Sequence, residues 1–173
     1  GINLIPVNDF SLYDLMLDTS VMLGAVPRRF RDISDSTDRY FAMARGTAGA
    51  AAMEMTKWFN TNYHYIVPEL EADMSFALDC SKMTDEYKLA RAQGHDVKIN
   101  LIGPLTYLAL SKTEDGRDPL SYLETIMPLY CQVLATAAAF DTEVYIQFDE
   151  PYFVKDAVSS ILALIRPVYD RLA

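Results

Sequence analysis

Short apolar runs alternate with longer amphipathic stretches along this chain, and this alternation is the strongest constraint on its fold. Residues 2–7, 98–102 and 144–148 are apolar runs of strand length, and stretches with apolar residues at helical spacing lie between them. Parallel strands need long crossover connections, which are usually helices. The sequence therefore predicts an α/β fold built from parallel β/α units.

The first amphipathic stretch is predicted to be a helix that begins at Ser11. Ser11 with Asp14 three residues later fits a capping box, and Gly24 is suited to end the helix. Residues 38–43 fit either a helix or a strand, and residues 46–52 remain ambiguous. The residues expected on one face of the first helix are Leu12, Leu15, Met16, Thr19, Met22 and Leu23.

Prolines mark the helices of the carboxyl-terminal third. Asp118 before Pro119 is a good helix start, because proline fits the first helical position. Pro128 is expected to kink or restart this helix, because proline removes a backbone donor and clashes with the preceding turn. A last helix over residues 156–172 is expected to be disturbed by Pro167 for the same reason.

Composition excludes several classes of function. The 173 residues are 51% hydrophobic, which allows one sizeable core. The net charge is −9 and the 15 Lys and Arg are scattered, so neither nucleic acid nor an anionic membrane surface is an expected partner. No apolar run approaches the ~20 residues of a spanning helix, and the first residues lack the pattern of a secretory signal. Cys80 and Cys131 fit no disulfide framework or metal motif, so a cytoplasmic location is expected.

Polar residues follow each predicted strand. Asn8 and Asp9 come after the first strand, Thr106 lies shortly after the second, and Asp149 and Glu150 follow the third. Ligand-facing residues gather at the carboxyl ends of parallel strands. Asn8, Thr106 and Asp149 are therefore expected near one end of the sheet.

The adjacent Asp149 and Glu150 allow an acid/base interpretation. Neighbouring strand residues point to opposite faces, so at most one of them can face a reacting centre. The structural alternative is that the pair caps helix amides or pairs with arginine. His64 is a candidate ligand, base or hydrogen-bonding residue, and the only other histidine, His95, leaves no multi-histidine metal site. The sequence contains no Gly-rich phosphate loop and no Gly-x-Ser-x-Gly elbow.

Residues 56–65 combine the only Trp of the chain with a Phe, two Tyr and a His around Lys and Asn side chains. Aromatic side chains interleaved with polar ones in this way are typical of a loop that holds a polar ligand with an apolar body. The alternative to a ligand-binding loop is a partly buried aromatic cluster, in which the polar ends of the side chains only make structural hydrogen bonds. Composition alone does not decide between the two.

Residues 54–65 read Glu-Met-Thr-Lys-Trp-Phe-Asn-Thr-Asn-Tyr-His-Tyr, and this block closely resembles a signature of the amino-terminal half of cobalamin-independent methionine synthase. The resemblance implies a partial TIM-like (β/α) barrel of about four units with parallel strands, with residues 1–173 as a single partial domain. It also supports a strand near residues 50–55, with Lys57 at its carboxyl end. The other matching blocks are residues 5–11, 41–46, 102–108 and 147–151.

The resemblance also implies a function. Members of that family transfer a methyl group from 5-methyltetrahydrofolate polyglutamate to homocysteine, without cobalamin, and a zinc ion holds the homocysteine thiolate. The zinc ligands belong to the carboxyl-terminal barrel half, the expected partner of this chain. The resemblance assigns Lys57 to the folate polyglutamate tail, a role that suits an ammonium group on a flexible stem. Further candidates for the folate cleft are Asn62, His64, Asp149 and Glu150.

This chain departs from the family pattern in three ways. Asn60 stands where the family usually has Asp, the Arg-x-x-Lys stretch that also grips the tail is absent, and the length is below the ~250 residues of a complete barrel. An excised fragment, the ordered part of a longer chain, and a truncated relative that closes by dimerising are all consistent with this length. Two other functions stay open: a barrel lyase such as a decarboxylase, and a non-catalytic module that binds a pterin-like or peptide ligand.

Overall fold

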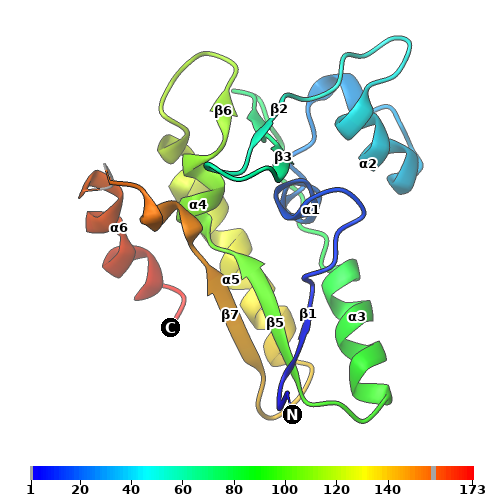
Figure 1. Ribbon diagram of the computed structural model, residues 1–173, viewed down its shortest axis with the longest axis vertical. Helices are drawn as coiled ribbons and strands as arrows, with labels where there is room; N and C mark the ends of the chain where they lie inside the picture. The colour runs from blue at the N-terminus through cyan, green and yellow to red at the C-terminus, as the bar shows by residue number, and fades with distance from the viewer. Residues whose placement is uncertain (1, 157–158) are drawn as a thin grey trace.

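The computed structural model describes residues 2–156 and 159–173 and has a mixed α/β fold (Figure 1). Its main sheet has three parallel strands in the order β1-β5-β7, so that β5 lies in the middle. The three predicted strands and their parallel arrangement are confirmed, although the first strand begins only at its fourth predicted residue. The strands are β1 (Ile5–Val7), β5 (Val97–Ile102) and β7 (Tyr145–Asp149).

Two smaller strand pairs lie beyond the carboxyl ends of the main strands, at the top of Figure 1. β2 (Met55–Lys57) and β3 (His64–Ile66) form an antiparallel hairpin. β4 (Glu69–Leu70) pairs in parallel with β6 (Lys112–Thr113). No strand pairing among the described residues closes the main sheet into a barrel.

Helices cover one face of the main sheet and the edge formed by β1. In Figure 1, α5 runs behind β5 and β7, and α3 lies beside β1. The Tyr130 hydroxyl on α5 donates a hydrogen bond to the Ile102 carbonyl at the end of β5, at 2.8 Å. The α-helices are α1 (Leu15–Leu23), α2 (Ser36–Arg45), α3 (Ser81–Ala92), α4 (Pro104–Ala109), α5 (Leu123–Ala138) and α6 (Ser159–Tyr169), and the 3₁₀ helices are η1 (Arg28–Phe30), η2 (Pro119–Tyr122) and η3 (Pro151–Val154).

The middle strand β5 has one apolar and one polar face. Ile99 and Leu101 are buried in the main core, whereas the alternate residues Lys98 and Asn100 are only half-buried. Alternation along a strand places these two pairs on opposite faces of the sheet. The polar face is continued on β7 by Gln147, the register partner of Asn100. Apolar burial therefore fixes the sheet against the helices and leaves polar side chains on its other side.

The first helix begins later than the sequence predicts, and its cap is a different residue. Asp14 is the N-cap, and its Oδ1 accepts hydrogen bonds from two backbone amides of the first turn at 2.8 and 2.9 Å. The Ser11 hydroxyl instead donates to Asp18 Oδ2. Leu12, expected on the buried face, precedes the helix and is 63% exposed. The predicted end at Gly24 is confirmed, with a φ of 69° that suits glycine.

The strand expected near residues 50–55 is absent except for its last residue. Residues 51–54 form no regular secondary structure, and a turn precedes them, in which the backbone amides of Thr47 and Ala50 each donate to the carbonyl of the other. Alanine has low strand propensity, so the three consecutive alanines at 50–52 do not favour a strand. Lys57 therefore lies in an antiparallel hairpin and not at the carboxyl end of a parallel strand. The ambiguous residues 38–43 are helical and belong to α2.

The prolines affect the later helices less than expected. The helix predicted at Asp118 begins as a 3₁₀ turn, in which Asp118 Oδ1 accepts from the Leu120 amide at 2.9 Å. α5 then continues through Pro128 without a restart. α6 likewise includes Pro167 in its last turn. Residues 157 and 158 of the predicted last helix lie outside the described residues.

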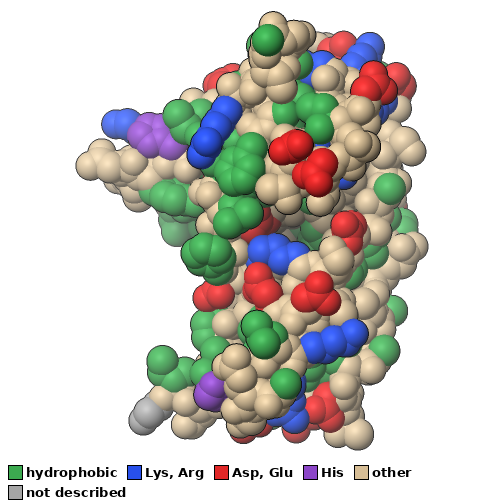
Figure 2. Space-filling view, turned by 90° about the vertical axis from the view of Figure 1, so that its right-hand side faces the viewer, with side chains coloured by type: hydrophobic (Ala, Val, Ile, Leu, Met, Phe, Trp, Pro, Cys, Tyr) green, Lys and Arg blue, Asp and Glu red, His purple; other side chains and the backbone are tan. Residues whose placement is uncertain are grey.

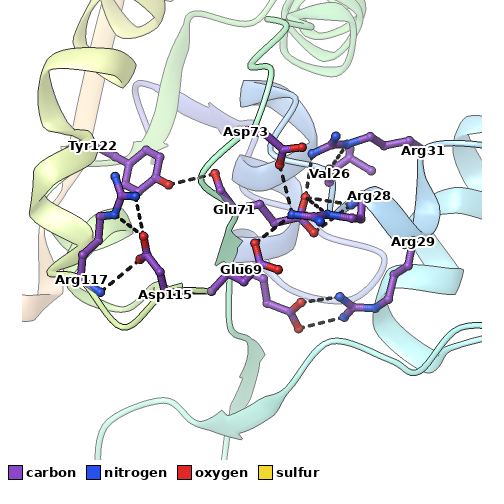
Figure 3. A network of polar contacts seen from close by, with 11 residues as sticks. Val26, Arg28, Arg29, Arg31, Glu69, Glu71, Asp73, Asp115, Arg117 and Tyr122 are labelled. Atoms are coloured by element: carbon purple, nitrogen blue, oxygen red, sulfur yellow. Dashed lines mark hydrogen bonds and ion pairs between the residues drawn. The ribbon is translucent and has the colours of Figure 1, made fainter.

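A network of ion pairs and hydrogen bonds ties η1 to β4 and the segment after it (Figure 3). Buried Glu71 accepts from the Arg28 amide at 3.0 Å and from the Arg31 guanidinium at 2.8 Å. Arg29 donates two bonds to the Glu69 carboxylate, at 2.6 and 2.9 Å. These contacts hold η1 against β4 and the segment that follows it.

Candidate functional site

A cavity of about 440 Å³ lies at the carboxyl ends of the parallel strands, where open α/β sheets commonly bind ligands. Asn8 lines it directly after β1, Asn100 lines it from β5, and Asp149 lines it at the end of β7. Residues of α1, α2 and α3 form the other walls. Thr106 lies in the first turn of α4, at the same end of the sheet, but does not line the cavity. The predicted clustering of Asn8, Thr106 and Asp149 at one end is confirmed.

Hydrogen bonds hold the polar wall of the cavity in place. The Asn8 amide donates to Glu86 Oε2 at 2.6 Å, and Asn8 Nδ2 donates to the Asn100 carbonyl at 2.9 Å. Asn8 has a φ of 59°, in the left-handed region that asparagine tolerates better than most residues. Lys82 Nζ lies 3.0 Å from Glu86 Oε1 and 3.6 Å from Asp18 Oδ2. The buried Asn100 Oδ1 has no hydrogen-bond donor among the described residues.

A second set of contacts orients Asp18 on the α1 side of the cavity. The Tyr40 hydroxyl donates to Asp18 Oδ1 at 2.7 Å, and the Ser11 hydroxyl donates to Asp18 Oδ2 at 2.8 Å. Burial and the neighbouring carboxylate raise the pKa of Tyr40 far above its usual value, so Tyr40 stays protonated and acts as a donor. Figure 2 shows acidic and basic side chains interspersed with hydrophobic ones on the face that it draws.

The two acidic residues at the end of β7 face different surroundings. Asp149 lines the cavity, and its Oδ1 accepts a hydrogen bond from Gln147 Nε2 at 2.7 Å. The Glu150 carboxylate turns to α4, where it accepts from two backbone amides of the first turn at 3.2 and 2.6 Å. It also accepts from the Tyr169 hydroxyl at 2.8 Å. Glu150 thus caps the amides of α4, as the structural interpretation of the Asp149–Glu150 pair predicted. Of the two residues, only Asp149 lines the cavity.

The β2–β3 hairpin carries Lys57, Asn62 and His64, and all three side chains are exposed. Lys57 and His64 are register partners across the hairpin. Trp58 is partly buried against the main core and packs edge-on against Tyr65, with 5.4 Å between ring centroids. The Trp58 and Tyr65 rings therefore anchor the hairpin, while its polar side chains remain in solvent. Lys57, Asn62 and His64 do not line the cavity at the sheet, so the candidate residues fall into two separate groups.

A lysine from the carboxyl-terminal part of the chain reaches the tip of this hairpin. Lys155 Nζ lies 4.7 Å from the Tyr152 ring centroid and 5.7 Å from the Phe59 ring centroid. Both distances are within the range of cation–π attraction. Among the described residues, no carboxylate lies within 4.0 Å of Lys57 or Lys155. The hairpin end of the molecule therefore presents positive charge that is not neutralised by an ion pair.

Residues 2–156 and 159–173 contain no group of three or more His, Cys, Asp or Glu side chains placed to hold a metal ion. Cys80 and Cys131 are free and half-buried, in line with the absence of a disulfide pattern in the sequence. In the same part of the chain, no helix is long and apolar enough to cross a membrane.

Several cavity residues were missed by reasoning from the sequence. Lys82 and Glu86 lie on α3, a helix that the apolar pattern did not identify, because only Met83 and Tyr87 of that helix are buried. Asp18 was placed on the predicted first helix but was given no role. Asn100 could have been found from the sequence, since it is a polar residue between the apolar Ile99 and Leu101 of a predicted strand.

Known proteins resemble the chain over its whole length. Residues 1–173 match the family described as "Cobalamin-independent synthase, N-terminal domain". Relatives named 5-methyltetrahydropteroyltriglutamate–homocysteine methyltransferase are similar to it: a protein of Desulforamulus reducens is 56% identical over 100% of this chain, one of Mycolicibacterium paratuberculosis is 48% identical over 99%, and one of Corynebacterium efficiens is 46% identical over 100%.

These relatives are much longer than the chain. The matched region is 23% of the Desulforamulus and Mycolicibacterium proteins and 24% of the Corynebacterium protein. The chain thus spans about a quarter of the length of the relatives that it matches. The match to the family description covers every residue, and identity reaches 56%. The chain belongs to the cobalamin-independent methionine synthase family, of which it represents the amino-terminal domain.

Proposed function

We propose that this chain helps an enzyme transfer a methyl group from 5-methyltetrahydropteroyltriglutamate to homocysteine, which yields methionine. The observation that carries the proposal is the match over residues 1–173 to relatives whose name states this reaction. The contribution of this part would be to bind the folate polyglutamate tail. Family membership favours this function over a decarboxylase and over a binding module without a catalytic partner.

Lys57 is the proposed contact for the tail carboxylates. Its side chain is exposed on a hairpin that Trp58 anchors to the core, and no carboxylate of the described residues lies within 4.0 Å of it. In a chain with a net charge of −9, such a local positive site favours an anion over the surrounding surface. Asn62 and His64 on the same hairpin are proposed to contribute hydrogen bonds. Glu150 is proposed to act only by holding α4.

The remaining parts of the reaction are proposed to come from elsewhere in the enzyme. Three parallel strands with helices on one face and polar side chains on the other fit one wall of a β/α barrel, which further chain would complete. The described residues contain no metal ligand set. Zinc would therefore be held by the carboxyl-terminal half, where it would bind the homocysteine thiolate.

Lys57→Ala should weaken binding of the triglutamate form of the folate about fivefold, with the carboxyl-terminal half present. One charge pair in a wet cleft contributes roughly 0.2–1 kcal/mol. Binding of the monoglutamate should be almost unchanged, because it lacks the additional tail carboxylates. The effect should shrink at high salt, which screens exposed charges. The measurement is the dissociation constant of each folate, by calorimetry, at two salt concentrations.

Lys88→Ala is the matched control, because Lys88 is an exposed lysine on α3 and does not belong to the hairpin. It should leave both affinities unchanged. If Lys57→Ala weakened both folates equally, Lys57 would act on the pterin end or on folding. If it weakened neither, the proposed tail contact would be wrong.

A further inference from the structure

Lys155 is an exposed lysine that approaches the same hairpin as Lys57 from a distant part of the chain. It directly follows η3, which lies just beyond the carboxyl end of β7. The lysines that have no carboxylate of the described residues within 4.0 Å are Lys57, Lys88, Lys98 and Lys155. Of these, Lys98 donates a hydrogen bond to Gln147 Oε1 at 2.5 Å, and Lys88 lies on α3. The remaining two, Lys57 and Lys155, therefore bring unpaired positive charge to one place.

Two aromatic rings hold the Lys155 ammonium beside the turn of the hairpin. Lys155 Nζ lies 4.7 Å from the centroid of the Tyr152 ring on η3 and 5.7 Å from the centroid of the Phe59 ring. Phe59 follows the last residue of β2, Lys57, by two positions. Attraction to the faces of two rings orients a cation without a carboxylate. The ammonium keeps its positive charge and has N–H donors to offer an anion.

The Phe59 ring is itself fixed in position. Phe59 has a φ of 54°, in the left-handed region that bulky residues rarely adopt. Its ring packs edge-on against Trp58, with 5.0 Å between ring centroids, and Trp58 packs against the main core. A strained backbone conformation persists only where the surrounding contacts impose it. The turn therefore holds the ring that faces Lys155 at a set place relative to Lys57.

A polyglutamate tail is an anion that suits two separate lysines. Each glutamate added to the folate adds one carboxylate, so the negative charges are spaced along a flexible chain. An ammonium group is a compact point charge without the bidentate fork of arginine, so one lysine is matched to one carboxylate. Once the first carboxylate is bound, the second contact is intramolecular and gains from a high effective concentration. Two cations on different segments would therefore favour a long tail over a short one.

We propose that Lys155 is a second contact for the polyglutamate tail, and that Lys57 and Lys155 hold different carboxylates of it. This inference rests on the proposed tail-binding function and adds to it a residue from the segment after β7. The number of cations that the tail reaches then determines the preference for triglutamate over monoglutamate. If Lys155 only joined its segment to the hairpin, its charge would affect both folates alike.

The test uses the full-length enzyme that contains this chain and measures the dissociation constants of the monoglutamate and triglutamate forms by calorimetry. Lys155→Met keeps an unbranched apolar stem beside the rings and removes the charge. It should raise the dissociation constant of the triglutamate about threefold and leave that of the monoglutamate unchanged. High salt should reduce this difference. Lys155→Arg should retain most of the wild-type affinity, because arginine keeps a cation that stacks on aromatic rings.

A double variant tests whether the two lysines hold different carboxylates. With separate contacts, Lys155→Met and Lys57→Ala together should weaken the triglutamate about fifteenfold, because independent losses of free energy add. A double variant no weaker than Lys57→Ala alone would contradict the proposal. Lys88→Met is the matched control, since Lys88 is exposed on α3, and it should change neither affinity.

The outcomes separate this inference from the proposed function. If Lys57→Ala weakened the triglutamate and Lys155→Met did not, the inference would be wrong and the proposed function would stand. Equal weakening of both folates by Lys155→Met would also overturn the inference. Selective weakening by Lys155→Met alone would support Lys155 as a tail contact and remove Lys57 from that role. If wild type bound both folates equally, the inference and the proposed tail-binding function would fall together.

Discussion

Replacing Asp14 by alanine is expected to lower the free energy of unfolding by about 2–4 kcal/mol. The side chain is fully buried, and its Oδ1 caps α1 through the amides of Met16 and Leu17. Its Oδ2 accepts from the Ile66 amide on β3 at 2.9 Å. Loss of an N-cap costs ~1 kcal/mol, and an orphaned buried amide costs about 1–3 kcal/mol more. A single carboxylate therefore joins the first helix to the hairpin that carries Lys57.

Urea denaturation of the variant and wild type measures this loss directly. Asp35→Ala is the matched control, because Asp35 also caps a helix, α2, but is exposed and accepts only from the Asp38 amide. Its loss should not exceed about 1 kcal/mol. Equal effects of the two substitutions would mean that Asp14 acts only as a cap and that its bond to Ile66 contributes nothing.

The same carboxyl should make stability depend on pH. Burial raises the pKa of Asp14 to about 6, against ~3.9 for an aspartate in an unfolded chain. The folded state therefore holds this proton more tightly, and its stabilising effect is complete below about pH 4 and lost as the pH rises through about 6. Between pH 7 and pH 5, wild type should gain about 1 kcal/mol relative to Asp14→Asn. Parallel stability curves for the two proteins over this range would contradict the prediction.

Reasoning from the sequence located the main sheet because the features that determine its strands lie in short, continuous stretches of sequence. Buried parallel strands are continuous apolar runs, and 98–102 is such a run apart from two polar residues. Gly24 ended its helix as predicted, because a left-handed residue at that position favours glycine. The polar residues that follow the strands then fell at one end of the sheet, since parallel strands place their carboxyl ends together.

The errors arose where distant contacts outweigh local preference. Ser11 and Asp14 are both good N-caps, and the choice of Asp14 depends on the Ile66 amide, 52 residues away. The hairpin at Lys57 was taken for the end of a parallel strand, because three-residue strands leave almost no periodic signal. The helical walls of the cavity were not predicted for a related reason: the cavity is lined by segments up to 141 residues apart, from Asn8 to Asp149.

Gly103→Ala is expected to lower the free energy of unfolding by about 2–3 kcal/mol, although the backbone conformation at position 103 is one that any residue can adopt. Gly103 has a φ of −68°, so no left-handed conformation requires glycine. A Cβ at this position, however, would lie 2.2 Å from both Cδ and Oε1 of Glu150. The carboxylate would have to leave the two α4 amides and the Tyr169 hydroxyl that it now accepts from. Gly49→Ala is the control, because nothing lies within 4 Å of a Cβ there.

A double-mutant cycle with Glu150→Ala tests this mechanism. Glu150→Ala removes the three atoms nearest to the added Cβ and leaves the α4 amides without their acceptor. Each single variant then loses the same hydrogen bonds, so Gly103→Ala with Glu150→Ala should unfold about as easily as Glu150→Ala alone. The coupling energy from urea denaturation should therefore be about 1–3 kcal/mol. If the losses of unfolding free energy were additive, Gly103 would be needed for a reason other than its contact with Glu150. The hydrogen bonds between Glu150 and α4 would then tolerate a displaced carboxylate.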